Sequence, residues 1–159
     1  MTRGPTRLDV TVGYATPRKG VPAAASFRRW AAAALHNRIR EADLAIRIVG
    51  EDEGRAFNRH YRGKDAATNV LSFPAERPPG LPKDARFPLL GDLLLCAPVI
   101  AREAAGQGKS VRDHYAHLTV HGVLHLLGWD HQDSVEAEAM EALERSVLAE
   151  LGIADPYRD

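Results

Sequence analysis

The spacing of three histidines within residues 121–131 constrains this chain more than any other feature. His121 and His125 stand four residues apart, and Gly128 separates them from His131. Because an α-helix turns by about 100° per residue, the first two side chains project from the same side of a helix. Glycine readily adopts the left-handed conformation that ends a helix, so Gly128 can turn the chain back and bring His131 toward the same point. The segment therefore predicts a helix, a sharp turn and three converging imidazoles.

Three converging imidazoles are a ligand set suited to a divalent metal. The pattern H-x-x-x-H-x-x-G-x-x-H is that of the metzincin zinc site, and three protein ligands leave one position open for water or substrate, as in catalytic sites. We therefore expect one Zn²⁺ on His121, His125 and His131. Metzincin peptidases carry a glutamate, the general base, directly after the first histidine. Here that position is Gly122, which favours a hydrolase of another substrate over a peptidase.

Two further histidines precede the expected ligands on the same helix, namely His114 and His117. His117 and His121 repeat the four-residue spacing and are a rival pair of ligands. His117 and His125 lie about 12 Å apart along the helix axis, too far to share one ion. His131 favours the pair His121 and His125, so we expect His114 and His117 to support the ligands or to line the groove beside them.

Hydrophobic patterning predicts one α/β domain over residues 1–159, with a small mixed four-stranded sheet, about five helices and the metal site on a central helix. A chain of 159 residues that is 45% apolar has the ordinary size and core content of a single domain. Alternating apolar residues predict strands, whereas apolar residues at helical spacing and capping residues predict helices. The expected strands are 8–14, 43–49, 69–73 and 90–96, and the expected helices are 23–40, 51–61, 98–106, 110–127 and one that is capped by Asp133 and ended by Gly152.

The sequence also predicts the local structure or burial of several individual residues. Gly106 should lie just past the end of helix 98–106, and residues 74–88, which hold five of the ten prolines, should form a surface loop. Cys96 should be a buried core residue, and Asp92 should be structural. The residues of the last helix that should point inward are Val135, Ala139, Ala142, Leu143 and Val147.

Composition and charge exclude some classes of function. Lys plus Arg and Asp plus Glu number 21 each, so affinity for nucleic acid must come from a local patch rather than from net charge. One cysteine cannot form an internal disulfide and suits a reducing compartment. The N-terminus lacks the apolar run of a secretory signal, and no stretch approaches the ~20 apolar residues of a membrane span. We expect a cytoplasmic protein without a membrane partner.

Three segments of the chain carry distinctive motifs. In chain order they are residues 58–74, with Tyr61-Arg62-Gly-Lys64-Asp65 followed by Leu-Ser-Phe-Pro, then Leu90-Gly-Asp92, and then His121 to His131. Together they resemble the YbeY family of bacterial single-strand-specific endoribonucleases. Their order is that of the family, and the likeness covers the chain from about Asp43 to Leu151. Ala67 stands where the family usually has proline, and Trp129 where it usually has tyrosine. Neither departure affects an expected ligand.

The resemblance implies both a reaction and a cellular role. It implies a zinc-dependent endoribonuclease with a catalytic arginine at Arg62, acting in maturation of the 3′ end of 16S rRNA and in ribosome quality control. The implied partners are single-stranded RNA, the small ribosomal subunit and a ribosomal protein or a GTPase. Two alternatives stay open, namely a zinc hydrolase of another substrate such as a peptide, and a non-catalytic ribosome-binding module whose metal only holds helix ends together.

Chemistry supports two candidate catalytic residues beside the metal. Phosphodiester cleavage builds negative charge on the phosphoryl oxygens, and a guanidinium can contact two of these oxygens at once, so Arg62 is a candidate for stabilising that charge. Asp130 directly precedes the expected third ligand. It could orient a histidine or take a proton, or it could simply be a turn residue.

A local basic cluster supplies candidate contacts to RNA. Arg55, Arg59 and Lys64 lie around Arg62 in an otherwise neutral chain, where an RNA backbone could follow them. A group of charged residues of this kind is often only a solvent-exposed surface with no role in binding. Phe73 could stack on a base, although a phenylalanine in a strand is more often part of the core.

Overall fold

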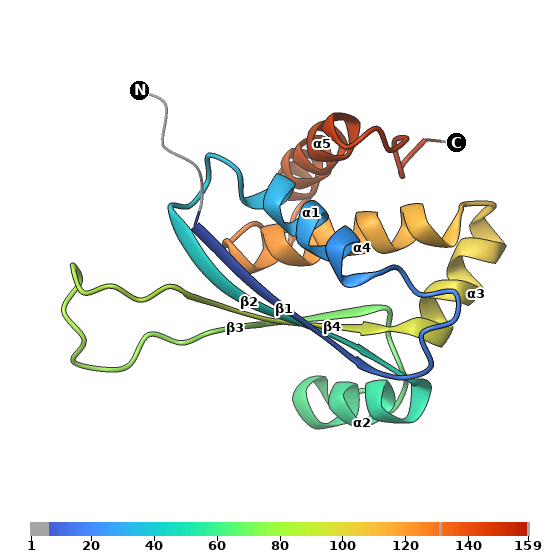
Figure 1. The fold of residues 1–159 in the computed structure, drawn as a ribbon, viewed down its shortest axis with the longest axis horizontal. Helices are drawn as coiled ribbons and strands as arrows, with labels where there is room; N and C mark the ends of the chain where they lie inside the picture. Colours follow the sequence, from blue (N-terminus) through green and yellow to red (C-terminus); the bar gives the residue numbers. More distant parts are fainter. Residues whose placement is uncertain (1–6, 131, 159) are drawn as a thin grey trace.

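A four-stranded mixed sheet carries helices on both of its faces (Figure 1). The computed structural model describes residues 7–130 and 132–158. The strand order is β1-β2-β4-β3, in which β1, β2 and β4 are parallel and β3 pairs antiparallel with β4. In chain order the elements are β1 (Arg7–Ala15), α1 (Ala24–Leu35), β2 (Glu41–Val49), α2 (Glu51–Arg62), β3 (Val70–Pro74), β4 (Leu89–Cys96), α3 (Ala97–Gln107), α4 (Val111–Leu126) and α5 (Ser134–Glu150). Within these ranges, the predicted single α/β domain with four strands and five helices is confirmed.

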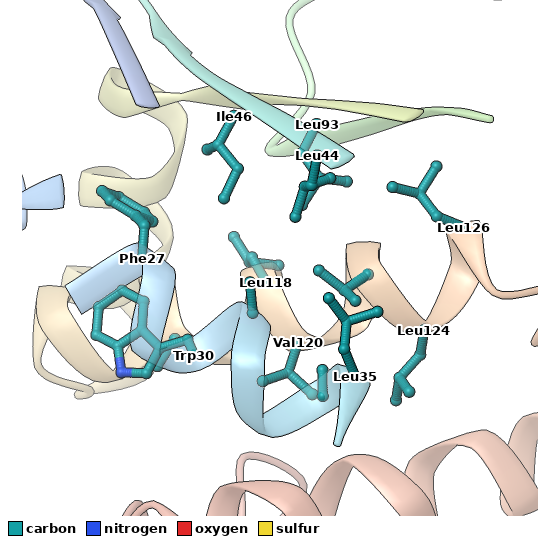
Figure 2. Packing of buried hydrophobic residues seen from close by; sticks show 14 of the residues in the cluster. Phe27, Trp30, Leu35, Leu44, Ile46, Leu93, Leu118, Val120, Leu124 and Leu126 are labelled. Atoms are coloured by element: carbon teal, nitrogen blue, oxygen red, sulfur yellow. The ribbon is translucent and has the colours of Figure 1, made fainter. Parts of the chain in front are cut away.

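The main core lies between the sheet and the layer of α1 and α4, and α5 packs outside that layer (Figure 1). Alternate residues of β2 are buried on this face because successive strand side chains point to opposite sides. Figure 2 shows Leu44, Ile46 and Leu93 of the sheet facing Leu118 of α4 and Phe27 of α1. In the described ranges, no helix is long and apolar enough to cross a membrane.

A second, smaller core lies under α2 on the opposite face of the sheet (Figure 1). Leu71, Leu94 and Cys96 form its floor, and Phe57 of α2 packs on it. Cys96 is 2% exposed, as predicted for a core residue. Burial raises the pKa of its thiol, because a thiolate is poorly solvated there. This thiol is therefore held in its unreactive form.

Helix α4 is the central helix of the fold and contacts α1, α3, α5, β3 and β4. It begins as predicted, because the hydroxyl of Ser110 accepts a hydrogen bond from the backbone N–H of Asp113 at 3.0 Å. Its end is also as predicted, since Gly128 has a φ of 103°, which favours glycine. Both signals lie at the helix ends themselves, so nearby residues determine where the helix that carries His121 and His125 begins and ends.

Gly122 lets α4 approach the sheet closely. A Cβ atom at this position would lie 2.7 Å from Cδ2 of Leu93 and 3.4 Å from Oγ of Ser72. The hydroxyl of Ser72 also donates a hydrogen bond to the carbonyl of Gly122 at 3.3 Å. A glutamate side chain has no room in this contact. The position at which metzincins carry their base is therefore used here for packing.

We expect Gly122→Ala to lower the free energy of unfolding by about 1–2 kcal/mol, because Leu93 must shift within a packed core. Gly106→Ala is a matched control, since Gly106 also lies within a helix but a Cβ atom there would meet nothing within 4 Å. That change should raise stability by up to about 1 kcal/mol through helix propensity. Chemical denaturation of both variants measures the difference. Equal stabilisation by the two substitutions would contradict the close approach.

Two predicted helix ends differ from the structure. The first helix stops at Leu35 instead of residue 40, and Asn37 adopts a φ of 61° just beyond it. Asparagine tolerates this left-handed conformation better than most residues do, so it ends the helix without a glycine. Gly106 does not end α3 but lies within it, and Gly108, with a φ of 65°, provides the left-handed turn.

The inward face of α5 also differs from the prediction. Leu143 is partly buried and Val147 is buried, as expected, but Val135, Ala139 and Ala142 are exposed. The buried residues are Met140, Glu144, Val147 and Leu148. The expected inward face was therefore wrong at Val135, Ala139 and Ala142, because the buried face of the helix runs through Met140 and Glu144 instead.

The proline-rich segment between β3 and β4 forms a long loop, as predicted, and extends away from the rest of the molecule (Figure 1). Arg77 donates hydrogen bonds across the loop to the carbonyls of Pro82 and Ala85. At the base of the loop, the guanidinium of Arg86 pairs with the carboxylate of Glu41, with Nε and Oε1 2.7 Å apart. These contacts give the loop a defined shape although it has no regular secondary structure.

Candidate active site

One pocket of about 370 Å³ brings Arg62 together with His121 and His125. The two histidines come from the C-terminal half of α4, and Arg62 is the last residue of α2. The remaining wall is formed by residues 68–72, which lead into β3 and form its first half. Because β3 is an edge strand, the pocket lies at the side of the sheet. Three of the residues predicted to carry chemistry therefore share one cavity.

The position of Arg62 depends on the turn that follows α2. Gly63 has a φ of 71° and its backbone N–H donates to the carbonyl of Arg59 at 3.1 Å, which ends the helix. The buried side chain of Asn58 then donates to the carbonyl of Ala66 at 2.6 Å and holds the connection to β3 against the helix. Arg62 itself is exposed at the pocket. Its side chain can therefore meet an anion that enters from solvent.

A buried carboxylate orients His121. Glu144 of α5 is 0% exposed, and its Oε2 lies 2.9 Å from Nδ1 of His121. A carboxylate only accepts hydrogen bonds, so Nδ1 of His121 must carry the proton. Nε2 is then the nitrogen with which His121 can bind a metal. A carboxylate behind a histidine is the usual arrangement around protein metal ligands.

Two further groups hold Glu144 in place. Its Oε1 accepts hydrogen bonds from Nε2 of His117 at 2.8 Å and from the hydroxyl of Tyr157 at 2.6 Å. Burial alone would raise the pKa of Glu144, but the hydrogen bonds from His117, His121 and Tyr157 outweigh it and lower the pKa to about 2. Glu144 is therefore a buried anion surrounded by donors.

A separate carboxylate–histidine pair lies at the start of α4. Nε2 of the buried His114 lies 2.9 Å from Oε1 of Glu103 on α3, and the same oxygen accepts from Nδ2 of Asn69 at 3.0 Å. Burial lowers the pKa of His114, although Glu103 opposes this shift. Asn69 lines the pocket, so this pair ties the pocket wall to α3 and α4. Of the two histidines that precede the expected ligands, His117 shares the carboxylate of Glu144 with His121, whereas His114 contacts the pocket wall only through Glu103.

Glu144 and Tyr157 are functional candidates that sequence reasoning missed. The signal for Glu144 was a charged residue within the apolar stripe formed by Met140, Val147 and Leu148, since a fully buried carboxylate almost always has a specific partner. Tyr157 had no such signal, because it lies in an irregular segment after the last helix. The contact of these two residues with His117 depends entirely on tertiary packing.

The donor atoms of the pocket fit a zinc ion. His121 and His125 offer imidazole ligands from successive turns of one helix, and Glu144 fixes the tautomer of the first. The predicted third ligand, His131, lies outside the described residues. Among the residues that the structure does describe, no group of three His, Cys, Asp or Glu side chains could hold a metal. Metal binding by His121, His125 and His131 therefore stays a prediction.

The other predicted site residues lie outside the lining of this pocket. Asp130 lines a different pocket of about 410 Å³, together with Trp129 and the start of α5. Arg55 forms a bidentate ion pair with Asp65, with both N–O distances 2.8 Å; the pair lowers the pKa of Asp65 and offsets the charge of Arg55. Arg59 and Lys64 are exposed near the C-terminal end of α2.

Phe73 lies on the α2 face of the sheet. Its ring contacts those of Tyr61 and Phe57, with centroids 5.0 Å and 6.2 Å apart. With these two residues it lines an apolar pocket of about 510 Å³, which also contains the exposed side chain of Asp92. Phe73 therefore belongs to an aromatic cluster that is partly exposed, separate from the pocket that contains His121.

Comparison with known proteins assigns the chain to a family. The family described as Endoribonuclease YbeY matches residues 18–152. The chain is 74% identical over 157 residues to the Endoribonuclease YbeY of Stenotrophomonas maltophilia (strain K279a), covering 99% of this chain and 98% of the relative. It is 72% identical, with the same coverage, to that of Xanthomonas axonopodis pv. citri (strain 306).

A solved structure shows the same fold. The solution structure of TM1509 from Thermotoga maritima superposes with a TM-score of 0.57 and 20% sequence identity, covering 96% of this chain and 99% of that one. At this identity the likeness concerns the fold alone. The family match and the relatives above 70% identity decide the assignment. The chain belongs to the YbeY family of endoribonucleases, which are hydrolases of RNA phosphodiester bonds.

Proposed function

We propose that this member of the YbeY family cleaves single-stranded RNA with one zinc ion held by His121, His125 and His131. The observation that carries the proposal is the shared pocket of Arg62, His121 and His125, with His121 oriented by the buried Glu144. A flexible single strand can place one phosphate in a recess of this kind. A stiff A-form duplex presents its phosphates along a regular helix instead.

Arg62 is the residue proposed to act on the scissile phosphate. Its guanidinium offers two parallel N–H groups, which match two phosphoryl oxygens and stabilise charge as it develops there. A zinc ion held by His121, His125 and His131 would supply Lewis acidity to the reaction. Glu144 keeps the proton of His121 on Nδ1 and thereby keeps Nε2 available as a ligand. Asp130, next to the proposed third ligand, is proposed to orient a ligand or to accept a proton.

The basic residues outside the pocket are proposed to guide the RNA backbone. Arg59 and Lys64 are exposed close to Arg62 in the chain, so they can attract phosphates that flank the cleaved bond. Arg55 contributes less in this view because Asp65 offsets its charge. Phe73 and the neighbouring Tyr61 offer aromatic surface on which a flanking base could stack.

We further propose that the RNA substrate is ribosomal. The family resemblance supports action at the 3′ end of 16S rRNA and in ribosome quality control, together with binding to the small subunit and to a ribosomal protein or a GTPase. A neutral chain with a local basic cluster agrees with an enzyme that is brought to its substrate by protein partners rather than by net charge.

The experiment that tests the proposal combines metal analysis with an RNA cleavage assay on the purified protein. We expect about one zinc per chain, cleavage of a single-stranded oligonucleotide and little cleavage of the same sequence in a duplex. His125→Ala serves as the metal-free comparison and should bind no zinc and cleave no RNA. Zinc-loaded protein that leaves single-stranded RNA intact would overturn the proposal.

The same preparation separates the two alternatives. A peptide hydrolase would cleave casein, which the packing of Gly122 against Leu93 disfavours because no glutamate base fits there. A non-catalytic ribosome-binding module would unfold when zinc is removed and would never cleave RNA. An open site with three ligands should instead keep its fold without zinc and melt at a lower temperature.

A further inference from the structure

We propose that Tyr157 is a positioning residue for the metal site: its hydroxyl holds Glu144 where that carboxylate fixes the tautomer of His121. The inference deepens the proposed function and rests on it, because it takes His121 as a zinc ligand. Tyr157 lies 36 positions after His121 in the chain, beyond the end of the last helix. The C-terminal segment would thus act on a ligand that it does not touch.

The two carboxylate oxygens of Glu144 accept hydrogen bonds from different residues. Oε2 accepts from Nδ1 of His121 at 2.9 Å, whereas Oε1 accepts from the Tyr157 hydroxyl at 2.6 Å and from Nε2 of His117 at 2.8 Å. Glu144 is 0% exposed, whereas Tyr157 beside it is 37% exposed. Without the hydroxyl, His117 would be the one described side chain that donates to Oε1. The carboxylate could then turn toward His117 and weaken its bond to His121.

The ring of Tyr157 is held by contacts that do not involve its hydroxyl. The backbone N–H of Tyr157 donates to Oδ1 of Asp155 at 2.8 Å, and Nε of Arg145 donates to the same oxygen at 3.2 Å. The guanidinium of Arg145 also lies 5.3 Å from the ring centroid. Arg145 follows Glu144 in α5, so one helix both presents the carboxylate and anchors the segment that supports it. A phenylalanine at position 157 should therefore keep its place.

The hydroxyl is a dependable donor in this setting. Burial and the adjacent Glu144 carboxylate both raise the pKa of Tyr157, so the phenol keeps its proton. Because a carboxylate only accepts, His117 must carry a proton on Nε2 and His121 must carry one on Nδ1. The network therefore requires a particular tautomer at each histidine. Tautomers can be read by ¹⁵N NMR in zinc-free protein, independently of any activity.

The test compares Tyr157→Phe with Tyr14→Phe. Tyr14 is a matched control because its hydroxyl donates one hydrogen bond, to the carbonyl of Pro22 at 2.7 Å, on a different part of the fold. Outer-shell partners of metal ligands typically contribute 10- to 100-fold to affinity, so Tyr157→Phe should weaken zinc binding about tenfold in a chelator competition. It should also give His121 a measurable population of the Nε2–H tautomer. Tyr14→Phe should leave both quantities at their wild-type values.

Each outcome decides one question. An unchanged His121 tautomer or unchanged zinc affinity in Tyr157→Phe would overturn the positioning role. An equal loss of zinc affinity in Tyr14→Phe would also overturn it, since the effect would then follow from general destabilisation. A wild-type protein that binds no zinc would overturn the proposed function instead, while the tautomer measurement on zinc-free protein would still decide whether Tyr157 acts through Glu144.

Discussion

Replacing Arg62 with alanine should lower the rate of RNA cleavage by roughly 10²- to 10³-fold while zinc binding stays intact. The reason is that Arg62 lines the pocket of His121 and His125 and is the residue proposed to contact the phosphoryl oxygens. It is exposed at the last position of α2. Its loss should therefore cost at most a few tenths of a kcal/mol of stability, from the helix dipole. Single-turnover cleavage at saturating enzyme, with zinc analysis of the same sample, measures the effect.

Two companion variants separate the shape of the guanidinium from its charge. Arg62→Lys keeps the positive charge but loses the planar fork that meets two oxygens, so its rate should fall between those of the wild type and the alanine variant. Arg29→Ala removes one exposed arginine from α1, outside the lining of the pocket, and should cleave at the wild-type rate. Wild-type cleavage by Arg62→Ala would exclude a role for this side chain in the reaction.

Replacing Glu144 with glutamine should weaken zinc binding by about 10- to 100-fold. Glutamine has nearly the same shape, but its amide has one accepting oxygen where the carboxylate has two. Three donors from His117, His121 and Tyr157 converge on this side chain, so at least one donor is left without an acceptor. His121 then loses the constraint that keeps its proton on Nδ1. The unsatisfied buried group should also lower the free energy of unfolding by about 1–3 kcal/mol.

The matched control for this prediction is Glu141→Gln. Glu141 lies on the same helix and forms a long salt bridge with Arg145, with the N and O atoms 3.9 Å apart. An ion pair of this kind contributes little. Zinc competition and thermal melts of both variants therefore isolate the effect of the buried carboxylate. If Glu144→Gln bound zinc as tightly as Glu141→Gln, the orienting role of Glu144 would be wrong.

Much of the fold follows from local signals in the sequence. Alternating apolar residues defined the strands, and the hydroxyl of Ser110 and the left-handed Gly128 defined the ends of α4. Such signals act over a few residues, through backbone hydrogen bonds and the period of the side chains. These signals did not locate a helix end correctly where two glycines that could end the helix lie close together in the sequence. Gly106 and Gly108 are two positions apart, and only the second is left-handed.

One part of the candidate site also follows from local sequence signals, whereas another part depends on tertiary packing. The placement of His121 and His125 on one helical face is a local consequence of their spacing. Their meeting with Arg62 depends on how α2 and the edge strand β3 pack beside α4. The family resemblance named Arg62, but periodicity alone did not distinguish it from Arg59, which lies on the same helix outside the pocket lining.

The sequence by itself determined the α/β class, the order of the elements and the helix that presents the two histidines, because each depends on patterns within one element. Only the tertiary structure decided which face of α5 is buried and that Glu144 lies behind His121. It also brought Tyr157 to that carboxylate. A buried anion is stable only where distant donors converge on it, and the convergence of α4, α5 and the C-terminal segment is a property of the packed chain rather than of any local pattern.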